Sequence, residues 1–141
     1  MSNTHPTDFK IMRDGTWFHD GAEIKRAALA KLFADRALVV DEAGKYWLKT
    51  PYEQYPVEVE DVPFVIVDYD VSANTVSMKT NMDEGFQINQ NTMWELRDGI
   101  PYVEVRAGLF ARLGRSVLYN LIEEFGQEFE SGGKAFALGD V

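Results

Sequence analysis

The hydrophobic and polar positions of the chain follow two periods, the alternation of a strand and the spacing of three and four of a helix. They predict a mostly β protein with two helices. Two turn signals six residues apart, Asp14-Gly15 and Asp20-Gly21, predict short strands and a tight hairpin within residues 9–21. Apolar residues from Ile24 to Phe33 recur at helical spacing, so we expect a helix over residues 25–34. A polar loop ending in Gly44 separates two further strand-like runs and predicts a second hairpin.

Strand signals also dominate the second half. Strands are predicted near residues 57–59, 64–67 and 74–78, and a hairpin is predicted around Asp98-Gly99. Apolar residues then repeat at three and four positions, which predicts a closing helix over residues 109–125 that Gly126 would end. Ser131-Gly132-Gly133 is interpreted as a flexible break before a short edge strand within residues 134–141.

The two halves echo each other. Trp47-Leu48 precedes the strand Pro56-Val57-Glu58-Val59, and Trp94-Glu95-Leu96 precedes the strand 101–105. We therefore predict a duplicated α+β fold of two small, related, mainly β halves, each with a helix. The predicted halves are residues 1–70 and 71–141, with a ligand groove between them.

Composition narrows the function classes. The 141 residues and 16.0 kDa suit one domain or two small units that share a core. A formal charge of -9 disfavours binding to nucleic acid or to an anionic membrane surface. The absence of cysteine excludes disulfides and thiolate catalysis. The polar start and the lack of an apolar run of about 18 residues predict a cytoplasmic protein.

The sequence contains no recognised catalytic motif. His5 and His19 are the only histidines and are not at ligand spacing, so neither a metal nor a cofactor is predicted. Nucleophile elbows, phosphate loops and dinucleotide fingerprints are absent. We therefore expect a protein that is not an enzyme. A weaker alternative makes Glu60 or Asp61 the general base of a small hydrolase or transferase.

Arginines stand out in a chain this acidic. Arg112, Arg115 and Tyr119 would form one stripe of the predicted last helix, and with Arg106 they could grip a phosphate or carboxylate. Internal salt bridges, for instance with Glu123, are the competing interpretation. In the loop around Thr50 and Glu53, the side chains of Tyr52 and Tyr55 are expected to be exposed because the loop is polar and lies between two prolines.

A set of positions spread over about residues 9 to 125 forms a combined pattern. They are Ile11, Asp14-Gly15, Trp17, Gly21, Ile24, Arg26, Leu29, Leu32-Phe33, Gly44, Tyr46-Trp47-Leu48, Thr50-Pro51, Glu53, Val59-Glu60-Asp61-Val62-Pro63-Phe64, Arg106, Gly108-Leu109, Ala111, Arg115, Val117, Tyr119 and Leu121. In this pattern the chain resembles a bacterial family of unknown function, the domain of unknown function numbered 1285.

The resemblance implies two α+β halves, of which the C-terminal one is superficially like a pleckstrin-homology barrel. It also implies a nucleotide-like ligand held between the halves and a part in bacterial signal transduction. Our first hypothesis is therefore a non-catalytic, regulatory, ligand-binding module, in which Arg115→Ala would weaken binding by about 1–3 kcal/mol. The predicted ligand-binding residues are Thr50, Tyr52, Glu53, Glu60, Asp61, Phe64, Arg106, Arg112, Arg115 and Tyr119.

The alternative hypothesis is a protein-interaction adaptor or a ligand-free dimerisation module that uses edge strands. Its partner would be another protein or a second copy of the chain. On this hypothesis, removal of residues 131–141 would abolish a dimer without unfolding the domain.

Overall fold

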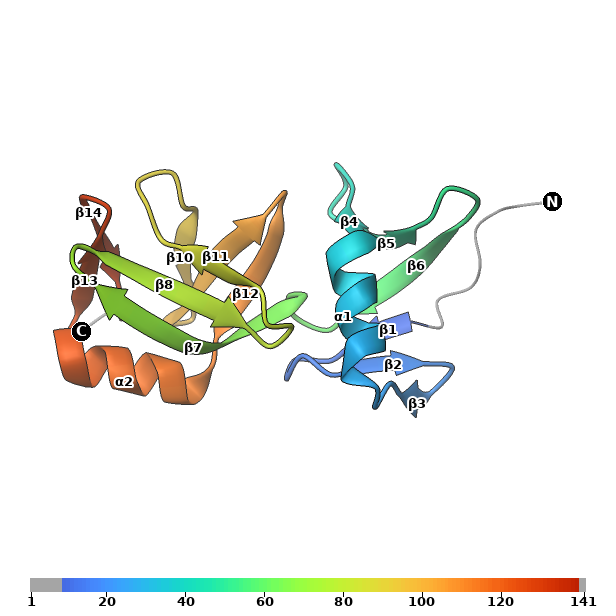
Figure 1. The fold of residues 1–141 in the computed structure, drawn as a ribbon, viewed down its shortest axis with the longest axis horizontal. Coiled ribbons are helices and arrows are strands. Elements are labelled where there is room, and N and C mark those ends of the chain that lie inside the picture. Colours follow the sequence, from blue (N-terminus) through green and yellow to red (C-terminus); the bar gives the residue numbers. More distant parts are fainter. Residues whose placement is uncertain (1–8, 140–141) are drawn as a thin grey trace. The chain divides into compact units, whose positions relative to one another are not determined.

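The computed structural model describes residues 9–139 and divides the chain into two compact units (Figure 1). The first unit comprises the residues up to Pro63 together with Ala107–Leu109, and the second comprises Phe64–Arg106 and the residues from Phe110 onwards. The predicted division after residue 70 falls inside the strand Phe64–Ser72. Pro63 directly precedes that strand, a position where its missing N–H costs no ladder hydrogen bond.

Six short strands of the first unit form one mixed sheet in the order β3-β2-β1-β6-β5-β4. The central pair β1 and β6 is parallel, and its crossover contains α1, which confirms the predicted helix. The buried helix residues Ala30 and Ala34 belong to the core, as does Trp17. The elements are β1 (Phe9–Ile11), β2 (Trp17–His19), β3 (Ala22–Glu23), α1 (Ala27–Arg36), β4 (Leu38–Val40), β5 (Tyr46–Lys49) and β6 (Gln54–Val59).

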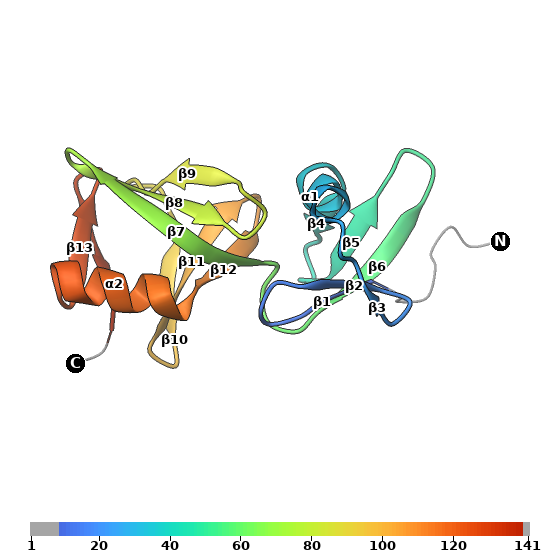
Figure 2. The same ribbon diagram turned by 60° about the horizontal axis from the view of Figure 1, so that its bottom comes forward.

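The second unit also contains a six-stranded sheet, in the order β10-β11-β12-β7-β8-β9, and a separate hairpin of β13 and β14. Its central pair, β12 and β7, is again parallel. The sheet is curled, with α2 beside it (Figure 2). The elements are β7 (Phe64–Ser72), β8 (Thr75–Thr80), β9 (Gly85–Gln87), β10 (Trp94–Arg97), β11 (Ile100–Arg106), β12 (Leu109–Leu113), α2 (Arg115–Phe125), β13 (Glu128–Ser131) and β14 (Lys134–Ala137).

Both sheets share one topology, which confirms the predicted duplication. In each, the first three strands run outward from the centre, the next three return to it, and the first and sixth strands pair in parallel. The helix lies between the third and fourth strands in the first unit and after the sixth in the second. Trp47 therefore belongs to a fifth strand and Trp94 to a fourth, so the sequence echo is offset by one strand from the structural repeat.

The predicted helix over residues 109–125 was wrong in its first part, because residues 109–113 form strand β12. Leu109, Ala111 and Leu113 are buried, whereas Phe110 and Arg112 between them are half-buried, which is a period of two. The helix α2 begins only at Arg115, after Gly114. Arg112 is therefore a strand residue and shares no helical face with Arg115.

The predicted flexible break at residues 131–133 is instead the turn of the hairpin between β13 and β14. Ser131 is fully buried, and its hydroxyl accepts a hydrogen bond from the Val76 N–H (2.8 Å) and donates one to the Ile88 carbonyl (2.6 Å). The rings of Phe129 and Phe136 are 5.4 Å apart and both are buried. The predicted edge strand is therefore part of the core. Asp140 and Val141 lie outside the described residues.

None of the helices among residues 9–139 is long and apolar enough to span a membrane.

Candidate functional site

The predicted ligand-binding residues of the loop between β5 and β6 form a compact turn. The Thr50 hydroxyl accepts hydrogen bonds from the N–H groups of Tyr52 (3.3 Å) and Glu53 (3.0 Å). The Glu53 carboxylate accepts one from the Tyr55 hydroxyl. The Tyr52 side chain is 85% exposed, as predicted. The prediction was wrong for Tyr55, which is half-buried because its ring packs edge-on against Phe9, 5.8 Å between ring centres. Thr50 thus shapes the loop, and Tyr52 presents an accessible side chain on it.

Glu60 and Asp61 lie at the other end of β6 and contact Arg13. The Glu60 carboxylate accepts a hydrogen bond from the Arg13 N–H (2.8 Å), and the Arg13 guanidinium lies 3.4 Å from the Asp61 carboxylate. The six residues of β6 separate this turn from the loop at Thr50 by about 20 Å. The structure therefore does not bring the two segments onto one wall of a small-molecule site.

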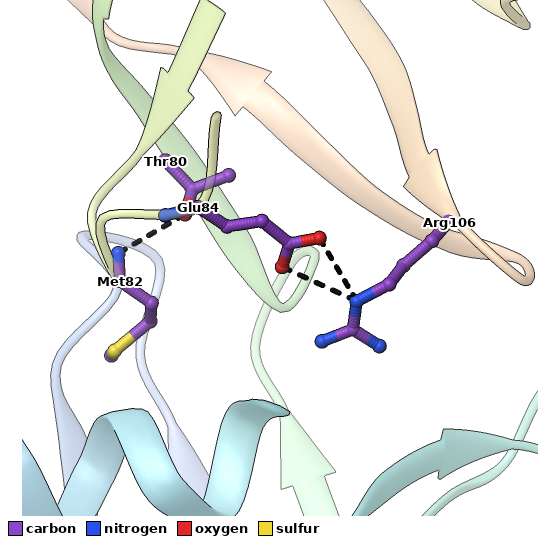
Figure 3. A network of polar contacts seen from close by, with 4 residues as sticks. All are labelled: Thr80, Met82, Glu84 and Arg106. Atoms are coloured by element: carbon purple, nitrogen blue, oxygen red, sulfur yellow. Dashed lines mark hydrogen bonds and ion pairs between the residues drawn. The ribbon is translucent and has the colours of Figure 1, made fainter. Parts of the chain in front are cut away.

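In the second unit, Arg106 lies beside Phe64 and Glu84. The Arg106 Nε donates to both Glu84 carboxylate oxygens, at 3.2 and 3.0 Å (Figure 3). The Arg106 guanidinium lies 5.8 Å from the centre of the Phe64 ring, which is fully buried. Phe64 is accordingly a core residue. Glu84 neutralises the positive charge of Arg106, which the prediction assigned to binding a phosphate or carboxylate.

Arg115 and Tyr119 contact each other on α2. The Arg115 Nε donates to the Tyr119 hydroxyl (3.2 Å), and this bond raises the pKa of the arginine. Arg115 lies beyond one end of β12, whereas Arg106 precedes its other end, about 17 Å away over five residues. The structure therefore also separates Arg106 from Arg115 and Tyr119, which the prediction placed together around one phosphate or carboxylate.

The turn that presents Glu84 depends on Thr80, which is fully buried. The Thr80 hydroxyl accepts hydrogen bonds from the N–H groups of Met82 (3.1 Å) and Glu84 (3.3 Å), and the first of them is drawn in Figure 3. We expect Thr80→Val to lower the free energy of unfolding by about 1–2 kcal/mol, because it leaves these donors without an acceptor. Urea denaturation measures this loss. Thr80→Ser, which keeps the hydroxyl, is the control, and an equal loss in both variants would contradict the explanation.

The structure reveals a groove that the sequence analysis missed, on the sheet of the first unit. Its volume is about 630 Å³, and it is lined by Phe9, Lys10, Met12, Phe18, Asp20, Gly21 and Glu58. Phe18, Lys10 and Glu58 are cross-strand neighbours on β2, β1 and β6 and form one row. The Lys10 ammonium lies 3.1 Å from the Glu58 carboxylate. The groove thus offers an aromatic ring, a cation and a carboxylate side by side.

Part of this groove could have been predicted from the alternation in β1. Phe9 and Ile11 are buried, while Lys10 and Met12, which alternate with them along the chain, are half-buried, the pattern of a strand with one covered face. The contribution of Glu58 could not have been predicted, because it depends on the parallel pairing of β1 with β6. No local turn signal specifies a pairing between strands so distant in the sequence.

Two other side chains, Asp41 and Tyr69, have shifted pKa values that their local structure explains. Hydrogen bonds from the Trp47 indole and from the N–H groups of Lys45 and Ala43 lower the pKa of Asp41, the indole contributing most, so this carboxylate organises its hairpin. Burial raises the pKa of Tyr69, as does its bond to Glu124. Within residues 9–139 there is no group of three or more histidines and carboxylates that could hold a metal ion.

Two family descriptions match the chain: "Domain of unknown function (DUF1285), N-terminal domain" over residues 2–62, and "Protein of unknown function (DUF1285), C-terminal domain" over residues 63–139. A crystal structure of a DUF1285 family protein from Silicibacter pomeroyi DSS-3 is 30% identical, with a TM-score of 0.85, over 100% of this chain and 84% of that one. Another, from Shewanella baltica OS155, is 31% identical, with a TM-score of 0.71, over 84% and 93%. No curated protein matches.

Proposed function

The chain belongs to the DUF1285 family in both of its units, and from this premise we propose that it is a non-catalytic module that binds a small molecule. The groove of the first unit is the proposed binding site. The proposal includes the regulatory role that the family resemblance implies and the cytoplasmic location expected from the polar start of the sequence and its lack of a long apolar run. The observation that carries it is the row of Phe18, Lys10 and Glu58 within a groove of about 630 Å³. Small-molecule sites have volumes of about 300–1,000 Å³.

The lining of the groove favours a planar heterocycle, such as a nucleobase. The half-buried Phe18 ring supplies a surface for stacking, and Met12 adds soft apolar contact. Lys10 donates hydrogen bonds and Glu58 accepts them, so together they suit a ligand edge that carries both acceptors and donors. Because Asp20 and Glu58 outnumber Lys10, the groove favours the base over a phosphate group.

The proposal is tested by thermal-shift screening of the full chain with nucleosides and nucleotides, followed by calorimetric titration of each compound that raises Tm. A ligand at about 100 times its Kd adds about 2.7 kcal/mol of stability, which such a screen detects. We expect nucleosides to bind at least as well as their phosphates. We also expect Phe18→Ala to weaken binding by about 1–3 kcal/mol, because it removes the stacking surface.

The matched control is Phe110→Ala, which removes a half-buried aromatic ring in the second unit and should leave binding unchanged. Arg115→Ala tests the site first predicted on the last helix, and so distinguishes binding at that site from binding in the groove. Loss of binding in Arg115→Ala with full binding in Phe18→Ala would contradict the groove, as would a folded protein that binds no compound of the panel.

A further inference from the structure

Besides the groove of the first unit, the exposed face of α2 is a candidate surface for binding a partner. Val117 and Leu121 are buried, and Arg115, Tyr119, Ile122 and Glu123 lie on the other side of the helix. The side chains of Tyr119 and Ile122 are 56% and 41% exposed. This face, defined by Arg115, Tyr119, Ile122 and Glu123, is called the α2 stripe below.

The charges at the two ends of α2 oppose the helix dipole. Arg115 is the first helical residue, the first turn has no acidic residue, and the last turn has no basic one. Glu123 and Glu124 stand near the C-terminal end instead. A cation at the N-terminus and carboxylates at the C-terminus of a helix are unfavourable placements. The arrangement therefore does not serve the stability of the isolated helix.

Among residues 9–139, the two charged side chains of the α2 stripe, Arg115 and Glu123, also lack ion-pair partners. Arg115 contacts Tyr119, through the bond at 3.2 Å and a guanidinium that lies 5.7 Å from the ring centre. Within residues 9–139, no carboxylate lies within 4.0 Å of the Arg115 guanidinium, and the Glu123 carboxylate has neither an ion pair nor a hydrogen bond. Glu124, in contrast, accepts a hydrogen bond from the Tyr69 hydroxyl (2.9 Å).

We propose that the α2 stripe is a self-association surface, on which a second copy of the chain places its own α2 in antiparallel orientation. Arg115 and Glu123 are each four residues from Tyr119, on opposite sides. A two-fold axis at Tyr119 therefore sets Arg115 of one copy opposite Glu123 of the other, twice. Tyr119 and Ile122 of both copies form the apolar centre between the two ion pairs.

The same pairing turns the unfavourable helix charges into favourable ones. In an antiparallel pair, the N-terminus of one helix lies beside the C-terminus of the other. Arg115 then lies at the negative end of the second helix, and Glu123 lies at its positive end. The α2 stripe is therefore complementary in charge to a second α2 stripe, and this favours a second copy of the chain as the partner.

The surface is small, which sets the expected strength of the contact. The 11 residues of α2 span about 16 Å, and a pair of such helices buries less than the roughly 1,200 Å² of a standard interface. We therefore expect a reversible dimer whose population rises with protein concentration. The surface lies in the second unit and does not use the groove of the first.

The test uses two charge-reversal variants of the full chain. Their association is measured by sedimentation velocity at protein concentrations from about 10 µM to about 1 mM. Arg115→Glu places two carboxylates opposite each other, and Glu123→Arg places two arginines opposite each other, so each variant alone should associate at least about tenfold more weakly than the wild type. An equimolar mixture should form a heterodimer, because the interface then again pairs arginines with carboxylates.

Both variants should remain folded, because each substitution improves the match between the charges of α2 and its dipole. Arg115→Glu puts a carboxylate at the N-terminus of the helix, and Glu123→Arg puts a guanidinium near its C-terminus, so each should keep or raise Tm. Weakened association in either variant therefore cannot be attributed to unfolding.

The control for net charge is Lys134→Glu, which makes the same change as Arg115→Glu at an exposed position outside the α2 stripe. It should associate as the wild type does. Equal weakening by Lys134→Glu would overturn the proposal. A wild type that is monomeric at about 1 mM, or a mixture of the two stripe variants that stays monomeric, would overturn it as well.

Discussion

Ending the chain after Glu130 is expected to unfold the second unit. This truncation removes the buried residues Ser131, Phe136 and Leu138. Loss of a buried Phe costs about 3–5 kcal/mol and loss of a buried Leu about 2–5 kcal/mol. The sum approaches the whole stability of a small domain, about 5–15 kcal/mol. Truncation therefore cannot test dimerisation separately from folding. The expectation from the sequence was that the domain would stay folded without residues 131–141.

The truncation is checked by amide NMR spectra, in which the dispersed signals of residues 64–106 and 110–130 should collapse. The point variant Phe136→Ala measures the same contact within a full chain and should lose about 3–5 kcal/mol in urea denaturation. Its control is Glu130→Ala, an exposed position of the same hairpin, which should stay within about 0.5 kcal/mol of the wild type. Well-dispersed spectra of the truncated chain would contradict this account of the hairpin.

Gly114→Ala is expected to destabilise the second unit by about 3 kcal/mol, at the upper end of the cost of overpacking. The Gly114 N–H donates to the Ile66 carbonyl at 3.0 Å, and a Cβ on residue 114 would lie 2.7 Å from that same oxygen. The oxygen belongs to the backbone of β7 and cannot rotate away, so the start of α2 must move. Gly114 has φ of -64°, which alanine adopts freely, and the cost is therefore steric.

The matched control is Gly139→Ala, because a Cβ there meets no atom within 4 Å. That substitution should be neutral or slightly stabilising, by up to about 1 kcal/mol, since it restricts the unfolded chain. Urea denaturation of both variants separates the two effects. Equal stability of the Gly114 and Gly139 variants would show that α2 can shift on β7 without cost.

The local elements of this protein were predictable where one turn signal or one period dominated. The hairpin at Asp98-Gly99 has positive φ at both residues, 53° and 78°, as its sequence indicates. The helix predicted at residues 25–34 agrees with α1. Residues 109–113 were misassigned because Leu109 and Leu113 suit a helical spacing as well as a strand, and only the parallel pairing with β7 separates the two.

The candidate site was less predictable than the fold. The predicted residues were chosen by chemical type, and the structure distributes them over the loop at Thr50, the turn at Asp61, the ion pair at Arg106 and the helix at Arg115. Sequence reasoning also placed no weight on Phe18 or Lys10. Their position beside Glu58 arises from strands that are distant along the chain and adjacent in the sheet.

By itself, the sequence determined that this chain forms two related, mostly β units with one helix each, because turn chemistry and hydrophobic period act over a few neighbouring residues. Only the tertiary structure decided which strands meet. The parallel pairs that join β1 to β6 and β7 to β12 have no local signal, and they place the row of side chains in the groove and the start of α2. Long-range pairing is decided by the burial of whole faces, which no short segment encodes.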